Sequence, residues 1–261
     1  MNIDINCDMG ESFGAYTLGM DSDIITSISS ANIACGFHAG DPLVMARTVR
    51  LARDHGVAIG AHPGFPDLLG FGRRNMHCDP AEIEAYLTYQ IGALMGFCAA
   101  NGVRLAHVKP HGALYNMAVG DDELIRTIAR AVARIDRDLL LVVLAGGQAE
   151  RMRAIAGEEG VKVVFEAFPD RGYTADGTLA PRALAGAVID DPEIAAERAL
   201  AMVQRGQVVS LAGTPVPMAV DTLCVHGDNP RAVALAAAIR ARLTAGGVAV
   251  SAMTAVGRGA G

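Results

Sequence analysis

The sequence predicts an α/β protein that folds as a TIM-like (β/α) barrel with seven or eight parallel strands. Short apolar runs alternate with helical patterns along the chain, which is typical of parallel strands joined by crossover helices. Four of these runs carry small or polar residues at every second position, as strands do when one face lines a barrel. The length of 261 residues also fits a barrel, which typically has about 250.

We expect the strands where short runs are rich in valine, isoleucine, leucine and alanine. In chain order these runs are Asn2–Cys7, Asn32–Phe37, Val57–His62, Arg104–Lys109, Leu139–Ala145, Lys162–Phe168, Leu223–His226 and Val248–Met253. Residues 207–220 are typical of a hairpin that turns at Gly213-Thr214-Pro215. Because this hairpin does not fit a simple repeat, the strand number stays open between seven and eight.

Helical patterns lie between most of the expected strands. They cover Pro42–His55, Pro80–Ala100, Asp121–Arg134, Pro192–Gln204 and Pro230–Ala245. Four of these helices begin in the same way, with Asp or Asn as N-cap and proline at the first helical position. The pairs are Asp41-Pro42, Asp79-Pro80, Asp191-Pro192 and Asn229-Pro230.

Side-chain alternation distinguishes a closed barrel from an open, doubly wound sheet. An open sheet covered by helices on both sides is apolar on both faces, whereas one face of the first four strands is small or polar. We therefore expect this face to line the interior of a barrel, with the active site at the C-terminal strand ends. Its positions are Asp4, Asn6, Asp8, Asn32, Ala34, Gly36, His38, Ala58, Gly60, His62, Leu105, His107, Lys109 and His111.

The composition indicates a globular protein with an ample core, because 51% of the residues are hydrophobic and the mean hydropathy is +0.30. We expect one domain over residues 1–261. A net charge of −6 has the wrong sign for nucleic acid or anionic lipid, so neither is expected as a partner. Asp4 and Asp8 lie where a signal peptide would be apolar, which favours a cytoplasmic protein with reduced cysteines.

The densest group of ionisable residues is the segment His107–Asn116. Alternation places His107, Lys109 and His111 on one face, and a packed core would not tolerate this group without function or strong pairing. Pro110 lacks the amide hydrogen that an inner strand needs, so we expect the strand to end there. We expect Lys109 to have a lowered pKa, or to meet a carboxylate or carbonyl of the substrate.

Further candidates follow the other strands. Asp8 and Glu11 stand at the end of the first strand, where a carboxylate can act as a base or a metal ligand, or can simply cap a turn. Asp4 lies deeper, and we expect it to pair with an inward Lys or Arg. His38 and His62 occupy equivalent positions after adjacent strands, which favours a shared pocket.

The last candidates lie in the C-terminal half. Asp170 and Arg171 follow a strand, and the guanidinium of Arg171 suits a substrate carboxylate, although a surface ion pair is the alternative. His226 again ends a strand, and Asp228 is not needed as a helix cap because Asn229 can serve. Nucleotide-binding motifs of the GxxxxGK[ST] and GxGxxG kinds do not occur in the sequence.

Several of these segments together resemble a known family. They are Asp4–Glu11, Ser30–Pro42, Ala61–Gly64, Gly70–Arg74, His107–Asn116 and Cys224–Pro230. With them the chain resembles the LamB/YcsF family over essentially its whole length. The resemblance implies a barrel similar to the glycoside hydrolase/deacetylase superfamily, working as one component of an ATP-dependent 5-oxoprolinase.

That resemblance implies a reaction and partners. The substrate would be 5-oxoproline, whose lactam ring is opened to glutamate while ATP is hydrolysed as co-substrate, together with two companion 5-oxoprolinase subunits. A homo-oligomer is compatible with this interpretation. An almost unstrained lactam resists opening unless its oxygen is activated and a base delivers water, so the need for ATP is reasonable even without a nucleotide motif in this chain.

We assign candidate roles on this basis. The expected catalytic residues are Asp8, His38, His62, Lys109, His111, Asp170 and His226. The expected substrate-binding residues are Asn6, Glu11, Arg74, His107, Arg171 and Asp228. The likeness to deacetylases further suggests a divalent metal held by Asp8, His62 and His111.

Two other functions stay open on the sequence. The chain can be a non-catalytic subunit that binds 5-oxoproline or docks the companion subunits, or it can be a stand-alone metal-dependent deacetylase or amidohydrolase. Assays of the chain alone and with its companions, with and without ATP, distinguish these alternatives.

Overall fold

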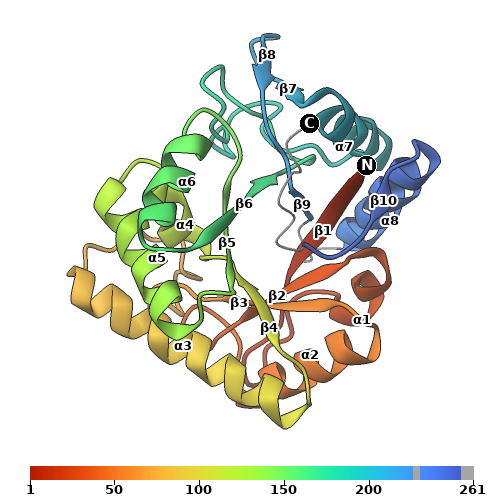
Figure 1. The fold of residues 1–261 in the computed structure, drawn as a ribbon. Coiled ribbons are helices and arrows are strands. Elements are labelled where there is room, and N and C mark those ends of the chain that lie inside the picture. The colour runs from red at the N-terminus through yellow and green to blue at the C-terminus, as the bar shows by residue number, and fades with distance from the viewer. Residues whose placement is uncertain (226–229, 254–261) are drawn as a thin grey trace.

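A closed barrel of seven parallel strands forms the centre of the molecule in the computed structural model, which describes residues 1–225 and 230–253 (Figure 1). Each strand pairs in parallel with the next, and β1 pairs with β9, which closes the barrel. The predicted fold class is thereby confirmed. The strands are β1 (Asn2–Met9), β2 (Ser30–Ala34), β3 (Ala58–His62), β4 (Leu105–Val108), β5 (Leu140–Leu144), β6 (Lys162–Ala167) and β9 (Thr222–Val225).

Three short strands lie outside the closed ring. The strand β10 (Ala249–Val250) pairs with the beginning of β1. The expected hairpin is present as β7 (Gln207–Val209) and β8 (Pro215–Pro217), which pair antiparallel. The chain therefore leaves the barrel after β6 and returns to it only at β9.

The helices surround the barrel, as Figure 1 shows. They are α1 (Asp21–Ile24), α2 (Pro42–Asp54), α3 (Pro80–Ala100), α4 (Gly112–Ala118), α5 (Asp122–Ile135), α6 (Ala149–Glu158), α7 (Pro192–Arg205) and α8 (Pro230–Ala245), with a 3₁₀ turn at Ile25–Ser27. The Asp-Pro starts of α2, α3 and α7 are confirmed. At α2, for example, the Asp41 carboxylate accepts the amides of Leu43 and Val44 at 2.8 and 2.9 Å, while the expected cap Asn229 lies outside the described residues.

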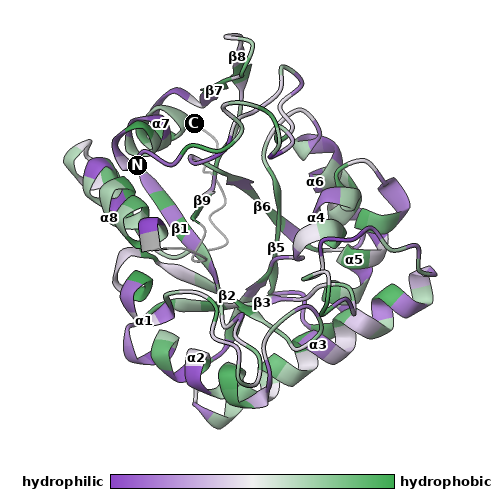
Figure 2. Cartoon of the chain, turned by 180° about the vertical axis from the view of Figure 1, so that it is seen from behind, coloured by the Kyte–Doolittle hydropathy of each residue, from purple (hydrophilic) through white to green (hydrophobic). Residues whose placement is uncertain are grey.

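The two faces of β1 have the alternation that the sequence predicts. Ile3, Ile5 and Cys7 are buried in the main apolar core between barrel and helices, whereas Asp4 and Asn6 are buried polar residues. Figure 2 shows the mixed hydropathy along β1 and on the helices. The described cysteines carry free thiols, and within residues 1–225 and 230–253 each helix is too short or too polar to cross a membrane.

Candidate active site

A cavity of about 550 Å³ opens where the barrel strands end. Its walls combine polar side chains from β1, β3 and β4 with apolar and basic residues from the loops that follow. The lining includes Asp8, His62, Arg73, Lys109, His111, Tyr115, Leu144, Phe168, Arg171 and Arg182. The active-site end expected from the sequence is therefore hollow and carries several of the predicted residues.

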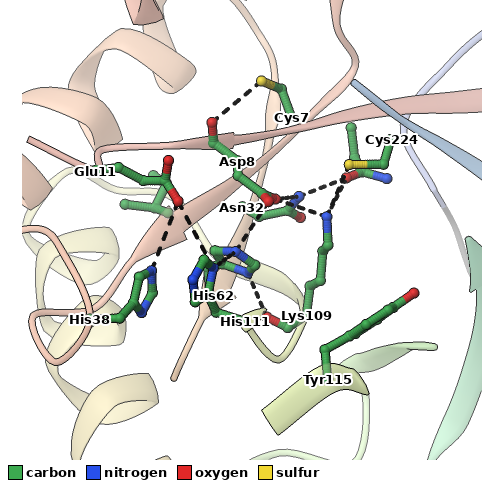
Figure 3. A network of polar contacts seen from close by, with 12 residues as sticks. Cys7, Asp8, Glu11, Asn32, His38, His62, Lys109, His111, Tyr115 and Cys224 are labelled. Carbon is green, nitrogen blue, oxygen red and sulfur yellow. Dashed lines mark hydrogen bonds and ion pairs between the residues drawn. The ribbon is translucent and has the colours of Figure 1, made fainter. Parts of the chain in front are cut away.

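The ammonium group of Lys109 is the centre of the polar contacts at this cavity (Figure 3). Its Nζ lies 2.8 Å from Asp8 Oδ1 and 2.9 Å from Glu166 Oε1. The same nitrogen donates to Cys224 Sγ at 3.1 Å and to Asn6 Oδ1 at 3.3 Å. Four groups from three strands thus fix one buried cation.

The charges of this group stabilise each other. Burial on its own would lower the pKa of Lys109, but the acidic groups around it, Asp8 foremost, raise it well above its usual value. Burial would likewise raise the pKa of Asp8, but His62 and Lys109 hold it well below the usual value. The expected lowered pKa of Lys109 is therefore wrong, because the barrel surrounds the amine with carboxylates.

A chain of amides carries the network across the barrel. Asn32 Nδ2 donates to Asn6 Oδ1 at 2.7 Å and to Asp8 Oδ1 at 2.8 Å. Asn32 Oδ1 lies 2.7 Å from His107 Nε2, and burial lowers the pKa of His107 to about 3. Since the imidazole is then neutral, its Nε2 carries the hydrogen and donates to the amide oxygen.

Asp4 has different partners from those predicted. Its carboxylate accepts hydrogen bonds from the hydroxyls of Ser29 and Ser30, both at 2.7 Å, and of Thr222 at 2.5 Å. The expectation of a Lys or Arg partner is therefore wrong. Burial raises the pKa of Asp4, and the three hydroxyl donors counteract part of that rise.

Three imidazoles gather beside the Lys109 group. The ring centroids of His38 and His62 lie 5.5 Å apart, so the shared pocket predicted for these two residues is present. His111 stacks on His38 with centroids 3.7 Å apart and planes at 2°. Together with Glu11 these histidines form a group that can hold a metal ion, since their ligand atoms lie within 4.8 Å of one another.

Glycines make room for these imidazoles. A Cβ atom on Gly60 would lie 2.0 Å from His107 Nε2, and one on Gly64 would lie 2.7 Å from His38 Nδ1. Gly72, at a φ of +64°, leaves only 2.8 Å between a Cβ and the side chains of His38 and His111. Side chains larger than hydrogen at these positions would displace the rings.

The predicted arginines lie differently from each other. Arg74 points away from the cavity, since its guanidinium pairs with Asp67 and its side chain is 65% exposed. Its neighbour Arg73 lines the cavity instead. Arg171 also lines it, but its guanidinium donates to two backbone carbonyls, those of Ala180 and Ala187.

Three other predicted residues are not part of the described cavity wall. Asp170 is buried but is not among the described residues that line the cavity. Both Asp170 and Arg171 are buried rather than forming a surface ion pair. His226 and Asp228 lie outside the described residues.

Two residues of the site have no role in the sequence interpretation. Glu166 on β6 is fully buried, and its Oε2 accepts the Tyr115 hydroxyl at 2.8 Å. Cys224 on β9 supplies the sulfur beside Lys109. The signal for Glu166 is a single acid in a strand of Val and Phe, which a buried position tolerates only when the charge is paired.

This arrangement brings together groups suited to hydrolysis. A buried ammonium can stabilise negative charge that develops on a carbonyl oxygen, an ionised carboxylate beside it can accept a proton, and arginines at the wall attract an anionic substrate. The fold and site define a TIM-like barrel with a hydrolase-type site at the carboxyl ends of its strands.

The chain belongs to the LamB/YcsF family, whose model matches residues 3–258. Two relatives from bacteria are both named as the first, or A, component of 5-oxoprolinase. The chain is 58% identical over 252 residues to the one from Heliobacterium modesticaldum, covering 97% of this chain and 98% of that one. It is 54% identical over 253 residues to the one from Syntrophobacter fumaroxidans, covering 97% and 99%.

A solved structure gives the same result. The lactam utilization protein from Thermus thermophilus superposes with a TM-score of 0.91 at 52% sequence identity, covering 97% of this chain and all of that one. The family expected from the sequence is confirmed, and the fold is that of the Thermus protein.

Proposed function

We propose that this chain is the component of a multi-subunit 5-oxoprolinase in which the lactam ring of 5-oxo-L-proline is opened to L-glutamate. The names of the relatives support the family role, and the position of Lys109 carries the proposal for this chain. Its ammonium lies between Asp8 and Glu166 at the cavity, where it can donate to the lactam oxygen. ATP would be hydrolysed by the complex, with the two companion subunits, in the cytoplasm.

The depressed pKa of Asp8 bears on the need for ATP. Asp8 is the ionised group at the cavity wall beside Lys109, and it is the candidate acceptor for the proton of the attacking water. A carboxylate whose pKa lies well below the usual range is a weak base. Because a weak base cannot open an unstrained amide rapidly, the lactam oxygen has to be activated first, and ATP can supply that activation.

The substrate carboxylate would lie toward the basic side of the cavity. Arg73, Arg171 and Arg182 line that side, and positive charge favours an anion there. Because two guanidinium nitrogens of Arg171 are engaged with carbonyl oxygens, Arg171 would act through its field more than as a bidentate fork.

The test is reconstitution with the companion subunits, following glutamate release from 5-oxoproline in the presence of ATP. Lys109→Met should lower kcat by ~10²–10³-fold, the range found when one group that stabilises an oxyanion is removed. The chain has a second lysine, Lys162, at the exposed start of β6. Lys162→Met is the matched control and should retain full activity.

Two results would favour other functions. Full activity of the complex with Lys109→Met would give this chain a binding or docking role, with the chemistry in a companion. Hydrolysis by the chain alone without ATP would favour a stand-alone amidohydrolase.

A further inference from the structure

A second group of polar side chains lies next to the Lys109 network and is not used by the proposed reaction. It consists of Glu11 after β1, His38 after β2, His62 at the end of β3, and His111 before α4. Figure 3 shows Glu11 and the three rings turned toward one another. Four separate segments of the chain thus contribute one ligand atom each.

Hydrogen bonds to the backbone determine which ring nitrogens carry hydrogen. His62 Nδ1 lies 2.7 Å from the carbonyl oxygen of Lys109, and His111 Nε2 lies 2.8 Å from the carbonyl oxygen of Phe71. A carbonyl oxygen can only accept, so each of these nitrogens must be the donor. In the neutral rings, His62 Nε2 and His111 Nδ1 then carry lone pairs.

These two lone pairs face each other at 2.9 Å. Two acceptors at that distance repel unless a positive group lies between them or beside them, which can be a proton or a metal cation. The backbone keeps the rings in this orientation. Phe71, whose carbonyl holds His111, has a φ of 53°, a conformation that costs energy for a residue with a bulky side chain.

His38 gives an independent indication of a ligand. Its side chain is fully buried, and among the described residues neither of its ring nitrogens has a hydrogen-bond partner. Glycines pack directly against its ring, so the chain forms a fitted space for an imidazole that makes no hydrogen bond. A buried polar group of this kind usually has a partner.

We propose that Glu11, His38, His62 and His111 bind a divalent cation of the zinc type. Three imidazole nitrogens and one carboxylate oxygen are a donor set that Zn²⁺ accepts, whereas Mg²⁺ and Ca²⁺ take oxygen ligands. A bound cation would supply Lewis-acid polarisation of a substrate oxygen. This inference goes beyond the proposed function, since it requires no particular substrate.

The distances fit such a site after small movements. Donor atoms around tetrahedral zinc lie roughly 3.3 Å apart, given bonds of about 2.0 Å. Glu11 Oε1 lies 3.9 Å from His111 Nδ1 and 4.0 Å from His38 Nε2, so the carboxylate has to approach slightly. Because the His38 ring is parallel to that of His111, it must also tilt to reach the common point, and we rank it as the weakest ligand.

This ligand set differs from the Asp8, His62 and His111 set suggested by the sequence resemblance. Asp8 Oδ1 is engaged by Lys109 and Asn32, and its Oδ2 lies 3.3 Å from His62 Nε2. Asp8 is therefore a neighbour of the site through His62, while Glu11 supplies the carboxylate ligand.

The experiment is a calorimetric titration of Zn²⁺ into untagged, chelator-treated protein, with Mg²⁺ as the comparison ion. The wild type should bind about one Zn²⁺ per chain and no Mg²⁺. His62→Gln and His111→Gln should weaken binding at least ~100-fold, since changes even in the surroundings of metal ligands cost 10–100-fold in affinity. His38→Gln should weaken it less.

A control and a second measurement keep the result independent of folding. His55→Gln, at the exposed C-terminus of α2, should bind Zn²⁺ as the wild type does. Circular dichroism should show that each variant is folded, and Co²⁺ in place of Zn²⁺ should give tetrahedral absorption bands that are lost in His111→Gln.

Two results would overturn the proposal. One is a wild type that shows no saturable Zn²⁺ binding, which would leave a proton shared between His62 and His111. The other is unchanged binding by His62→Gln and His111→Gln. The titration contains neither 5-oxoproline, ATP nor companion subunits, so failure of the proposed reaction would leave its outcome unaffected.

Discussion

The inner surface of the barrel has two unlike halves. On β1 to β4 it is polar, as Asp8, Asn32 and Lys109 show. On β5 and β6 the inward positions Leu140, Val142 and Val164 are apolar and pack with Met253. The comparison teaches that the apolar half provides surroundings of low polarity, in which the charges of the other half interact strongly.

Glu166 is the exception in the apolar half. It lies two residues after Val164 on β6 and reaches across to Lys109 and Tyr115. A charge is tolerated on that side because the polar half supplies its partners. The predictions below test whether partners, rather than the side of the barrel, decide which charges are stable.

The largest effect is expected for a charge placed among the apolar residues. Val142→Asp puts a carboxylate beside Leu140, Val164 and Met253, and should lower the free energy of unfolding by about 4 kcal/mol, because a buried charge without a partner is among the most destabilising changes. Urea denaturation measures this loss. Val142→Thr keeps the shape and should cost less than half as much, and equal losses would contradict the comparison.

Removing the acid that joins the halves should have the next largest effect. Glu166→Ala takes partners from Lys109 and Tyr115, and should cost about 3 kcal/mol of unfolding free energy, the lower end for a broken buried ion pair. Glu150→Ala is the matched control, because it removes an exposed pair with Arg153 on α6. A loss as small as that of the control, under about 1 kcal/mol, would show that Glu166 is dispensable.

The smallest effect concerns Asp4, a carboxylate whose partners are hydroxyls rather than cations. Since its pKa is raised in the folded protein, the folded state binds the proton more tightly than the unfolded state. Stability should therefore fall as the pH rises from about 3.9 through the folded pKa. Asp4→Asn should remove this fall, which denaturation at several pH values measures, and a variant with an unchanged pH profile would rule out Asp4 as its source.

Much of the fold follows from the sequence. Strand and helix positions, the Asp-Pro starts of α2, α3 and α7, and the polar inner face agree with the structure. These features depend on local chemistry and on a side-chain period of two, both of which are readable along the chain. The excursion through β7 and β8 also has a local signal, in the turn at Gly213-Thr214-Pro215.

The pairing inside the site is less predictable. Alternation places Asp8, His62, Lys109 and His111 on one face, but the partner of Lys109 depends on how far neighbouring strands are staggered around a closed ring. For this reason alternation does not identify Glu166. The predicted partner of Asp4 is wrong because serine and threonine hydroxyls are common and have no distinctive pattern, although three of them satisfy one carboxylate here.

The closure of β1 on β9 has a consequence for biosynthesis. Asp4 and Lys109 acquire Thr222 and Cys224 as partners only after almost the whole chain has left the ribosome. Until then the first strands carry charged groups without their final neighbours, which contacts of such long sequence separation make slow to complete. Nascent chains that stop before β9 should therefore remain protease-sensitive, with the last strand acting as the step that commits the barrel to its native form.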